Sequence, residues 1–178
     1  NDTATTEIYT LSLHDALPIS WIAKYPIMRA FDIESSCKMG SGCLMIDASS
    51  NKFLLIKRSQ YVSSPHTWCL PGGMVDFGES ASSACARELL EETGIRCDEQ
   101  DLHLIHQMHY HAPEFVFNTF ALIMNNETTP SLNWESDDFV WVTIDDLPSP
   151  LHPGVEAMFN NDLAAKKLND IIDLKKRC

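Results

Sequence analysis

Residues 73–95 read GMVDFGESASSACARELLEETGI, and the second half of this stretch crowds Glu88, Glu91 and Glu92 into five positions. On a helix these glutamates stand at positions i, i+3 and i+4, which places all three carboxylates on one face. Like charges at this spacing destabilise an isolated helix by about 0.2–0.5 kcal/mol per pair. Taken alone, such a cluster is more often a solvated helix face. A bound divalent cation would make it favourable, because carboxylate oxygens are the ligands that Mg²⁺ prefers.

The boundaries of the helix are readable from single residues. Ser80 is a good N-cap residue, and Gly94 is well placed to end the helix. Before the helix, TWCLPGG (67–73) contains a Pro-Gly-Gly breaker, which predicts a loop. The stretch therefore predicts a glycine-rich loop followed by a helix with an acidic face.

The spacing of the whole stretch is specific. Gly73 is followed after five residues by Glu79, and after seven more by RELLEETGI, residues 87–95. This matches the Nudix box, G-x5-E-x7-R-E-U-x-E-E-x-G-U with U apolar, at every specified position. The chain therefore resembles the Nudix hydrolase family, and the resemblance covers roughly residues 40–150.

The resemblance implies a fold and an activity. The implied fold is α/β: a Nudix-type α/β/α sandwich with a mixed β-sheet in a single domain. The implied activity is Mg²⁺- or Mn²⁺-dependent hydrolysis of a nucleoside diphosphate linked to another group. ADP-ribose or another nucleoside diphosphate sugar, a (deoxy)nucleoside triphosphate and a dinucleotide all remain open as the nucleotide-type substrate.

The resemblance also implies roles for residues of the box. Four residues are the expected metal ligands, the glycine through a backbone carbonyl: Gly72, Glu88, Glu91 and Glu92. Glu88 and Glu92 are the central pair among them and are counted as catalytic. Four further residues are expected to support the box structurally: Gly73, Glu79, Arg87 and Gly94. If Glu79 lies in the loop, it can fold back and pair with Arg87, which would fix the loop on the helix.

The reaction also needs a carboxylate that accepts a proton from the attacking water. In this family a glutamate outside the box often serves. Glu135 is the preferred candidate, with Asp137, Asp138 and Glu114 as alternatives that the sequence does not separate.

The rest of the chain predicts strands around this helix. Apolar and β-branched runs predict five strands, the first two joined by a hairpin: 43–46, 52–58, 102–111, 114–124 and 139–144. Residues 155–176 predict one C-terminal helix. Strands before, between and after helices indicate a mixed α/β class.

Composition bounds the partners. The 178 residues carry a formal net charge of -12, so nucleic acid is not an expected partner. No apolar run approaches the ~20 residues that span a membrane. The six cysteines form no C-x-x-C pair, which indicates free thiols and a cytoplasmic location. A homodimer is compatible with the resemblance, but no sequence feature forces one.

The N-terminal residues are treated separately. Residues 1–19, NDTATTEIYTLSLHDALPI, resemble the translation of a sequencing-library adapter. Residues 1–27 are therefore expected to be a non-native or disordered extension, and residues 28–178 the Nudix hydrolase domain with its C-terminal helix.

Four histidines in 103–111 suggest zinc at first sight. Strict strand alternation would put His103, His109 and His111 on one face and His106 on the other. Ligands spaced along one straight strand are too far apart for zinc, so hydrogen bonding to substrate or half-burial is the expectation.

Two other functions are weighed against hydrolysis. One is a non-catalytic Nudix-like nucleotide-binding sensor, but such domains usually lose box glutamates, and this chain keeps them all. The other is isomerisation of an isoprenoid diphosphate, which needs a cysteine nucleophile such as Cys69 or Cys85.

Overall fold

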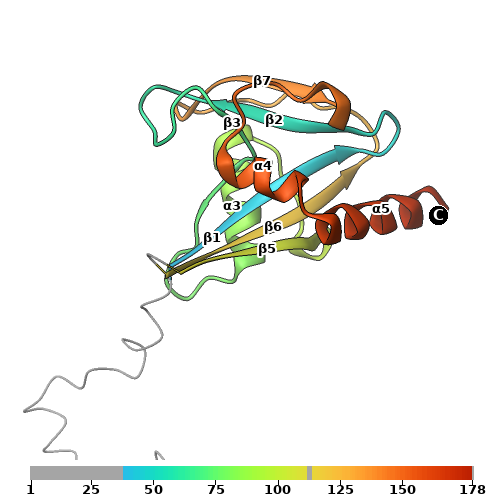
Figure 1. Cartoon of the computed structure of the whole chain (residues 1–178), viewed down its shortest axis with the longest axis horizontal. Coiled ribbons are helices and arrows are strands. Elements are labelled where there is room, and N and C mark those ends of the chain that lie inside the picture. Colours follow the sequence, from blue (N-terminus) through green and yellow to red (C-terminus); the bar gives the residue numbers. More distant parts are fainter. Residues whose placement is uncertain (1–37, 112–113, 178) are drawn as a thin grey trace, which may run out of the picture. The chain divides into compact units, whose positions relative to one another are not determined.

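A seven-stranded sheet forms the centre of the structure, a computed structural model that describes residues 38–111 and 114–177. Five strands run in the order β3-β2-β1-β6-β5, while β4 pairs with β1 and β7 with β2 (Figure 1). The strands are β1 (Lys38–Asp47), β2 (Lys52–Arg58), β3 (Trp68–Cys69), β4 (Gly72–Met74), β5 (Leu102–His111), β6 (Glu114–Met124) and β7 (Ser136–Val142). Since β1 and β6 are parallel and the other pairs antiparallel, the sheet is mixed.

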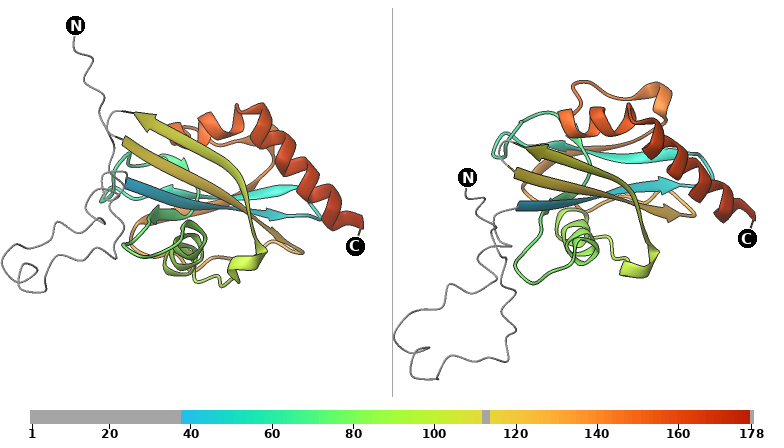
Figure 2. Two further views of the ribbon diagram at one scale, coloured as in Figure 1. Left: turned by 90° about the horizontal axis from the view of Figure 1, so that it is seen from below. Right: turned by 60° about the horizontal axis from the view of Figure 1, so that its bottom comes forward.

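Helices cover both faces of this sheet. The helices are α3 (Ala81–Thr93), α4 (Pro153–Phe159) and α5 (Asp162–Arg177), with short 3-10 turns at Glu99–Asp101 and Ile144–Asp146. Figure 2 shows α3 on one face of the sheet and α4 and α5 on the other. The expected α/β/α sandwich is therefore confirmed.

The central strand β1 explains the two layers. Its residues Cys43 and Met45 belong to the apolar cluster under α3, whereas Leu44 and Ile46 belong to the cluster under α4 and α5. A strand buried on both faces reads as a continuous apolar run rather than as an alternation. The run at 43–46 has this character, and the strand extends beyond it on both sides.

The C-terminal segment differs from the single helix expected over 155–176. It forms α4 and α5, separated at Asn160 and Asn161. The Asn161 side chain accepts a hydrogen bond from the Ala164 backbone N–H at 3.0 Å, so it caps a new helix rather than continuing the old one.

The histidine strand also differs from the expectation. A β-bulge between Leu104 and His106 in β5 shifts the register, so that Leu104 pairs with Phe120 and His106 with Thr119. The extra residue reverses the alternation, which puts His103 and His106 on one face and His109 and His111 on the other. The assignment of faces by strict alternation was therefore wrong.

The expected extension 1–27, including the adapter-like residues 1–19, lies outside the described residues. Within the described part of the chain, no helix is both long and apolar enough to cross a membrane.

Candidate active site

Helix α3 begins and ends where its sequence indicates. The Ser80 side chain accepts a hydrogen bond from the Ser83 backbone N–H at 3.0 Å. At the other end, Gly94 adopts φ 71° and donates its N–H to the Leu90 carbonyl at 2.9 Å. A left-handed residue at this position favours glycine, and the two caps fix which helix turns carry the glutamates.

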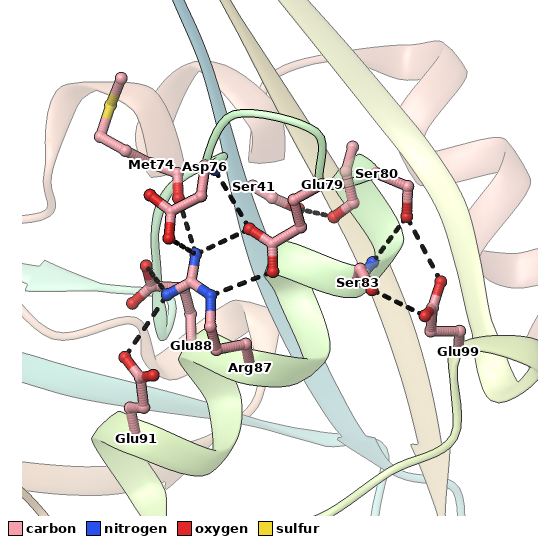
Figure 3. A network of polar contacts seen from close by, with 11 residues as sticks. Ser41, Met74, Asp76, Glu79, Ser80, Ser83, Arg87, Glu88, Glu91 and Glu99 are labelled. Atoms are coloured by element: carbon pink, nitrogen blue, oxygen red, sulfur yellow. Dashed lines mark hydrogen bonds and ion pairs between the residues drawn. The ribbon is translucent and has the colours of Figure 1, made fainter.

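Arg87 joins the loop to the helix (Figure 3). Its Nε and Nη2 donate to the two carboxylate oxygens of Glu79, each at 3.0 Å, and Nη2 also donates to the Met74 carbonyl at 2.9 Å. The described loop therefore contains the fold-back ion pair between Glu79 and Arg87. This paired geometry is the strong, directional form of an arginine–carboxylate contact.

Arg87 also contacts two of the box glutamates. Its Nη1 lies 2.8 Å from Glu88 and 3.4 Å from Glu91. The side chain of Glu91 is 54% exposed, whereas that of Glu88 is 15% exposed. The three carboxylates are thus unequal: Glu91 lies on the outside of the helix, and Glu88 turns inward.

Gly73 lies against the Glu88 carboxylate. A Cβ at this position would overlap the Glu88 carboxylate group, so only glycine lets the two approach this closely. Burial raises the pKa of Glu88, while the neighbouring Arg87 lowers it.

Glu92 is the most buried of the box glutamates, at 5% exposure. Its Oε2 accepts a hydrogen bond from the Gly72 backbone N–H at 2.8 Å. Burial raises the pKa of Glu92 to about 8, against the smaller effect of the Gly72 N–H. With this pKa the metal-free Glu92 carboxyl group is mostly protonated at neutral pH, and among the described residues it takes part in no ion pair.

The segment before β7 brings Glu135 to these carboxylates. Ser131 donates its N–H to the Thr93 carbonyl at 2.8 Å, and Asn133 donates to the Glu92 carbonyl at 3.3 Å. From the other side, the Ser59 N–H donates to the Glu135 carbonyl at 2.8 Å. The negative charge of Glu135 contributes to the raised pKa values of both Glu88 and Glu92, and therefore acts within the same site.

The alternative proton acceptors lie elsewhere. Asp137 and Asp138 are exposed on β7, and Glu114 is exposed at the start of β6, paired with His111. Of the four acids, Glu135 is the one whose negative charge raises the pKa values of both Glu88 and Glu92. Of the four candidates, Glu135 is the one that the structure brings to the box.

The comparison with known families decides the identity of this arrangement. The family model described as NUDIX domain matches residues 38–161. The chain belongs to the Nudix family. The match covers the loop, helix α3 and the segment that carries Glu135.

Similar proteins are found by sequence and by structure. Nudix hydrolase 7 of Arabidopsis thaliana is 32% identical over 92 residues, which are 51% of this chain and 32% of that protein. The NUDIX domain of Shewanella oneidensis NrtR, solved with ADP ribose, has a TM-score of 0.64 at 18% identity and covers 82% of this chain and 97% of that one. A MutT NUDIX hydrolase from Burkholderia pseudomallei has a TM-score of 0.61 at 24% identity, covering 71% and 98%. At these identities the structures show the Nudix fold, and the chain spans about a third of the curated relatives it matches.

Nudix hydrolases generally depend on a divalent metal, and the residues present fit such an ion chemically. The donors in the site are carboxylate oxygens of Glu88, Glu92 and Glu135, which suit a hard cation. In the structure the Glu88 carboxylate accepts a hydrogen bond from Arg87, and the Glu92 carboxyl group accepts one from Gly72. The described residues contain no group of three or more His, Cys, Asp or Glu side chains arranged to hold a metal ion. A divalent ion would stabilise the ionised form of the buried Glu92 carboxyl group, which burial disfavours.

The cysteines required for the isomerase alternative are poor nucleophiles. Cys85 is 1% exposed in the cluster under α3. Cys69 is 6% exposed, and burial raises its pKa to about 11, so its thiol is protonated at neutral pH.

Two residues near the site were missed from sequence. Arg58 ends β2, and its positive charge lowers the pKa of Glu92. His152 caps α4, where its Nδ1 accepts the Gly154 N–H at 3.2 Å. The sequence signal for His152 is the following Pro-Gly, since proline favours the first turn of a helix; Arg58 gave no signal beyond closing a strand.

Proposed function

We propose that the chain is a Mg²⁺-dependent Nudix pyrophosphohydrolase, with Mn²⁺ as an alternative ion, that cleaves a nucleoside diphosphate linked to another group. The observation that supports this most is the buried Glu92 carboxyl group, which has Glu88 and Glu135 as negative neighbours and forms no ion pair with a described residue. Ionising a carboxyl group at 5% exposure is costly, and this cost is expressed in its pKa of about 8. A divalent cation would stabilise the ionised form.

In this proposal Glu88 and Glu92 are the central metal ligands, with Glu91 and the Gly72 carbonyl completing the set from the chain. The bound ion would offset the charge of the diphosphate and lower the pKa of a water molecule. Gly72 and Gly73 keep the loop backbone close to the carboxylates, since a Cβ at Gly72 would meet the Ser41 carbonyl and one at Gly73 would displace the Glu88 carboxylate. Glu79 and Arg87 act indirectly by holding the loop on α3.

Glu135 is the proposed proton acceptor. The attacking water oxygen forms a bond to phosphorus, its proton passes to the Glu135 carboxylate, and the bond from phosphorus to the bridging oxygen breaks. Backbone hydrogen bonds of the 131–135 segment to Thr93, Glu92 and Ser59 support this role, because they fix the backbone that carries Glu135. General-base catalysis requires a positioned carboxylate.

The wider assignment follows the same proposal. Residues 28–178 form the hydrolase domain, and the substrate is a nucleotide-type small molecule rather than nucleic acid. A cytoplasmic location agrees with the four free thiols among the described residues. A homodimer is compatible with these roles but is not required by them.

Turnover on a nucleotide panel tests the proposal. ADP-ribose, nucleoside diphosphate sugars, nucleoside triphosphates and dinucleotides are incubated with the protein at several Mg²⁺ and Mn²⁺ concentrations, and phosphate is measured after coupled phosphatase treatment. We expect metal-dependent turnover of one substrate class and its loss in Glu92→Gln. Tight binding of a nucleotide by a folded protein that turns nothing over would instead establish the sensor function.

A further inference from the structure

A cavity of about 120 Å³ lies on the sheet face covered by α4. One wall consists of side chains from β5 and β6, and the other comes from α4, including Val155 and Met158. Gly72 also lines the cavity, and its N–H is the group that holds Glu92. The cavity therefore adjoins the carboxylate site, although α3 lies on the opposite face of the sheet (Figure 2).

The wall formed by β6 consists of aromatic rings that pack directly against glycines of β1. A Cβ at Gly40 would lie 2.7 Å from the Phe117 ring and 2.8 Å from the Phe115 ring, and one at Gly42 would lie 2.9 Å from Phe117. The two glycines of β1 thus leave the room that these rings occupy. Tyr110 continues the wall, with its ring centroid 5.8 Å from that of Phe115. Such a wall suits a planar aromatic group.

Two arginines near the site differ in their partners. Arg87 is surrounded by carboxylates within 4.0 Å. Arg58 lines the cavity and forms no ion pair with any other described residue. Its Nε and Nη2 donate to Ser63, but the partner of Nη1 is the Cys69 sulfur at 3.9 Å, a weak acceptor. Arg58 therefore retains donor capacity and charge for a ligand.

His152 adds a second donor. Because its Nδ1 accepts the Gly154 N–H, the neutral ring carries its proton on Nε2. Burial, followed by the charge of Arg58, lowers the pKa of His152, which favours this neutral form. The lining of the cavity thus combines an aromatic wall with donors from Arg58 and His152.

We propose that this cavity binds the base of the substrate and selects a 6-oxopurine, guanine or hypoxanthine, over adenine. The inference rests on the proposed nucleotide hydrolase function and names its substrate class. An arginine fork matches the O6 and N7 acceptors of a 6-oxopurine, whereas adenine presents an amino donor at position 6. The adenine amino group and the arginine are both donors, so neither can satisfy the other, and the unmade hydrogen bonds disfavour adenine.

Binding of IMP and AMP by calorimetry, in the absence of divalent metal, tests the selection without relying on turnover. IMP is expected to bind about 10- to 100-fold more tightly than AMP. Glu92→Gln should keep this ratio, so a failure of hydrolysis and a failure of base selection remain separate results. Equal affinities, a preference for AMP, or no binding of either nucleotide overturns the proposal.

Variants assign the preference to the two donors. Arg58→Lys keeps the positive charge but loses the fork, and His152→Ser keeps an N-cap acceptor for α4 but has no reach into the cavity. Each is expected to bring the IMP to AMP ratio toward one. Lys57→Gln, at the neighbouring cation that lies 5.9 Å from the Trp68 ring centroid, should leave the ratio unchanged. If both Arg58→Lys and Arg58→Gln weaken the two nucleotides equally, Arg58 contacts phosphate and the base assignment is wrong.

Discussion

The backbone N–H of Gly72 donates to Oε2 of Glu92 at 2.8 Å, across the junction between the glycine-rich loop and helix α3. Glu92 is only 5% exposed, and this bond is the one hydrogen bond that its carboxyl group receives from the described residues. The loop is thus fixed to the helix at the most buried of the box glutamates.

Metal-free stability should depend on pH through Glu92. Its folded pKa of about 8 is above the ordinary glutamate value of 4.5, so between these two pH values the folded state holds a proton that the unfolded state releases. The resulting stabilisation is complete below about pH 4.5 and is lost as pH rises through about 8. In urea unfolding with chelator, the wild type should lose about 2–4 kcal/mol relative to Glu92→Gln between pH 5 and pH 9. Parallel pH profiles for the two proteins would contradict this.

Alanine at the two loop glycines should separate function from folding. Gly73→Ala meets the flexible end of Glu88, so the carboxylate is displaced while the fold remains. We expect a melting temperature within a few degrees of wild type and a fall in kcat of at least about 10-fold.

Gly72→Ala is the contrasting variant. Its φ of 156° and the Ser41 carbonyl both oppose a Cβ, so this variant should lose stability as well as activity. Equal effects of the two substitutions on melting temperature would count against the distinction.

The ion pair between Glu79 and Arg87 should be worth more than an exposed pair. A double-mutant cycle with Glu79→Gln and Arg87→Lys is expected to give a coupling energy of about 1 kcal/mol. The matched control is Lys52 with Glu127, 2.8 Å apart with both side chains 38% exposed, for which we expect less than about 0.5 kcal/mol. If the coupling energy of the control pair were as large as that of Glu79 with Arg87, the two-bond geometry of Arg87 would not strengthen its ion pair.

The proton-acceptor role distinguishes Glu135 from nearby acids. Glu135→Gln should lower kcat by about 100- to 10,000-fold. Asp138→Asn, three positions on and exposed on β7, should leave kcat unchanged. If the two variants exchange these outcomes, the acceptor is Asp138 instead.

Much of the box could be predicted because its determinants are local. Ser80 and Gly94 are capping residues, and Glu79 and Arg87 need only a loop that folds back on one helix. The strand at 43–46 could be predicted as an apolar run, because both of its faces are buried.

The remaining features depend on long-range pairing or on small local changes. Arg58 and Glu135 come to the site through the pairing of β2 with β7 and the bond from Ser59 to Glu135. Sequence could name Glu135 only as one of four acids. The bulge in β5 inserts a single residue, and no residue type in LHLIHQMHYH marks it. The Asn161 side chain caps a new helix and so divides the C-terminal segment into two helices. Helical periodicity alone does not reveal this division.

Mn²⁺ binding, measured by the loss of the free-ion electron paramagnetic resonance signal with Mg²⁺ as competitor, tests Glu92 as a metal ligand most directly. We expect saturable binding by the wild type that Mg²⁺ displaces. This binding should weaken as pH falls below about 8, and Glu92→Gln should reduce it by at least about 10-fold. Asp138→Asn should bind as the wild type does. Undiminished Mn²⁺ binding in folded Glu92→Gln, or no binding by the wild type, would contradict the assignment of Glu92 as a metal ligand.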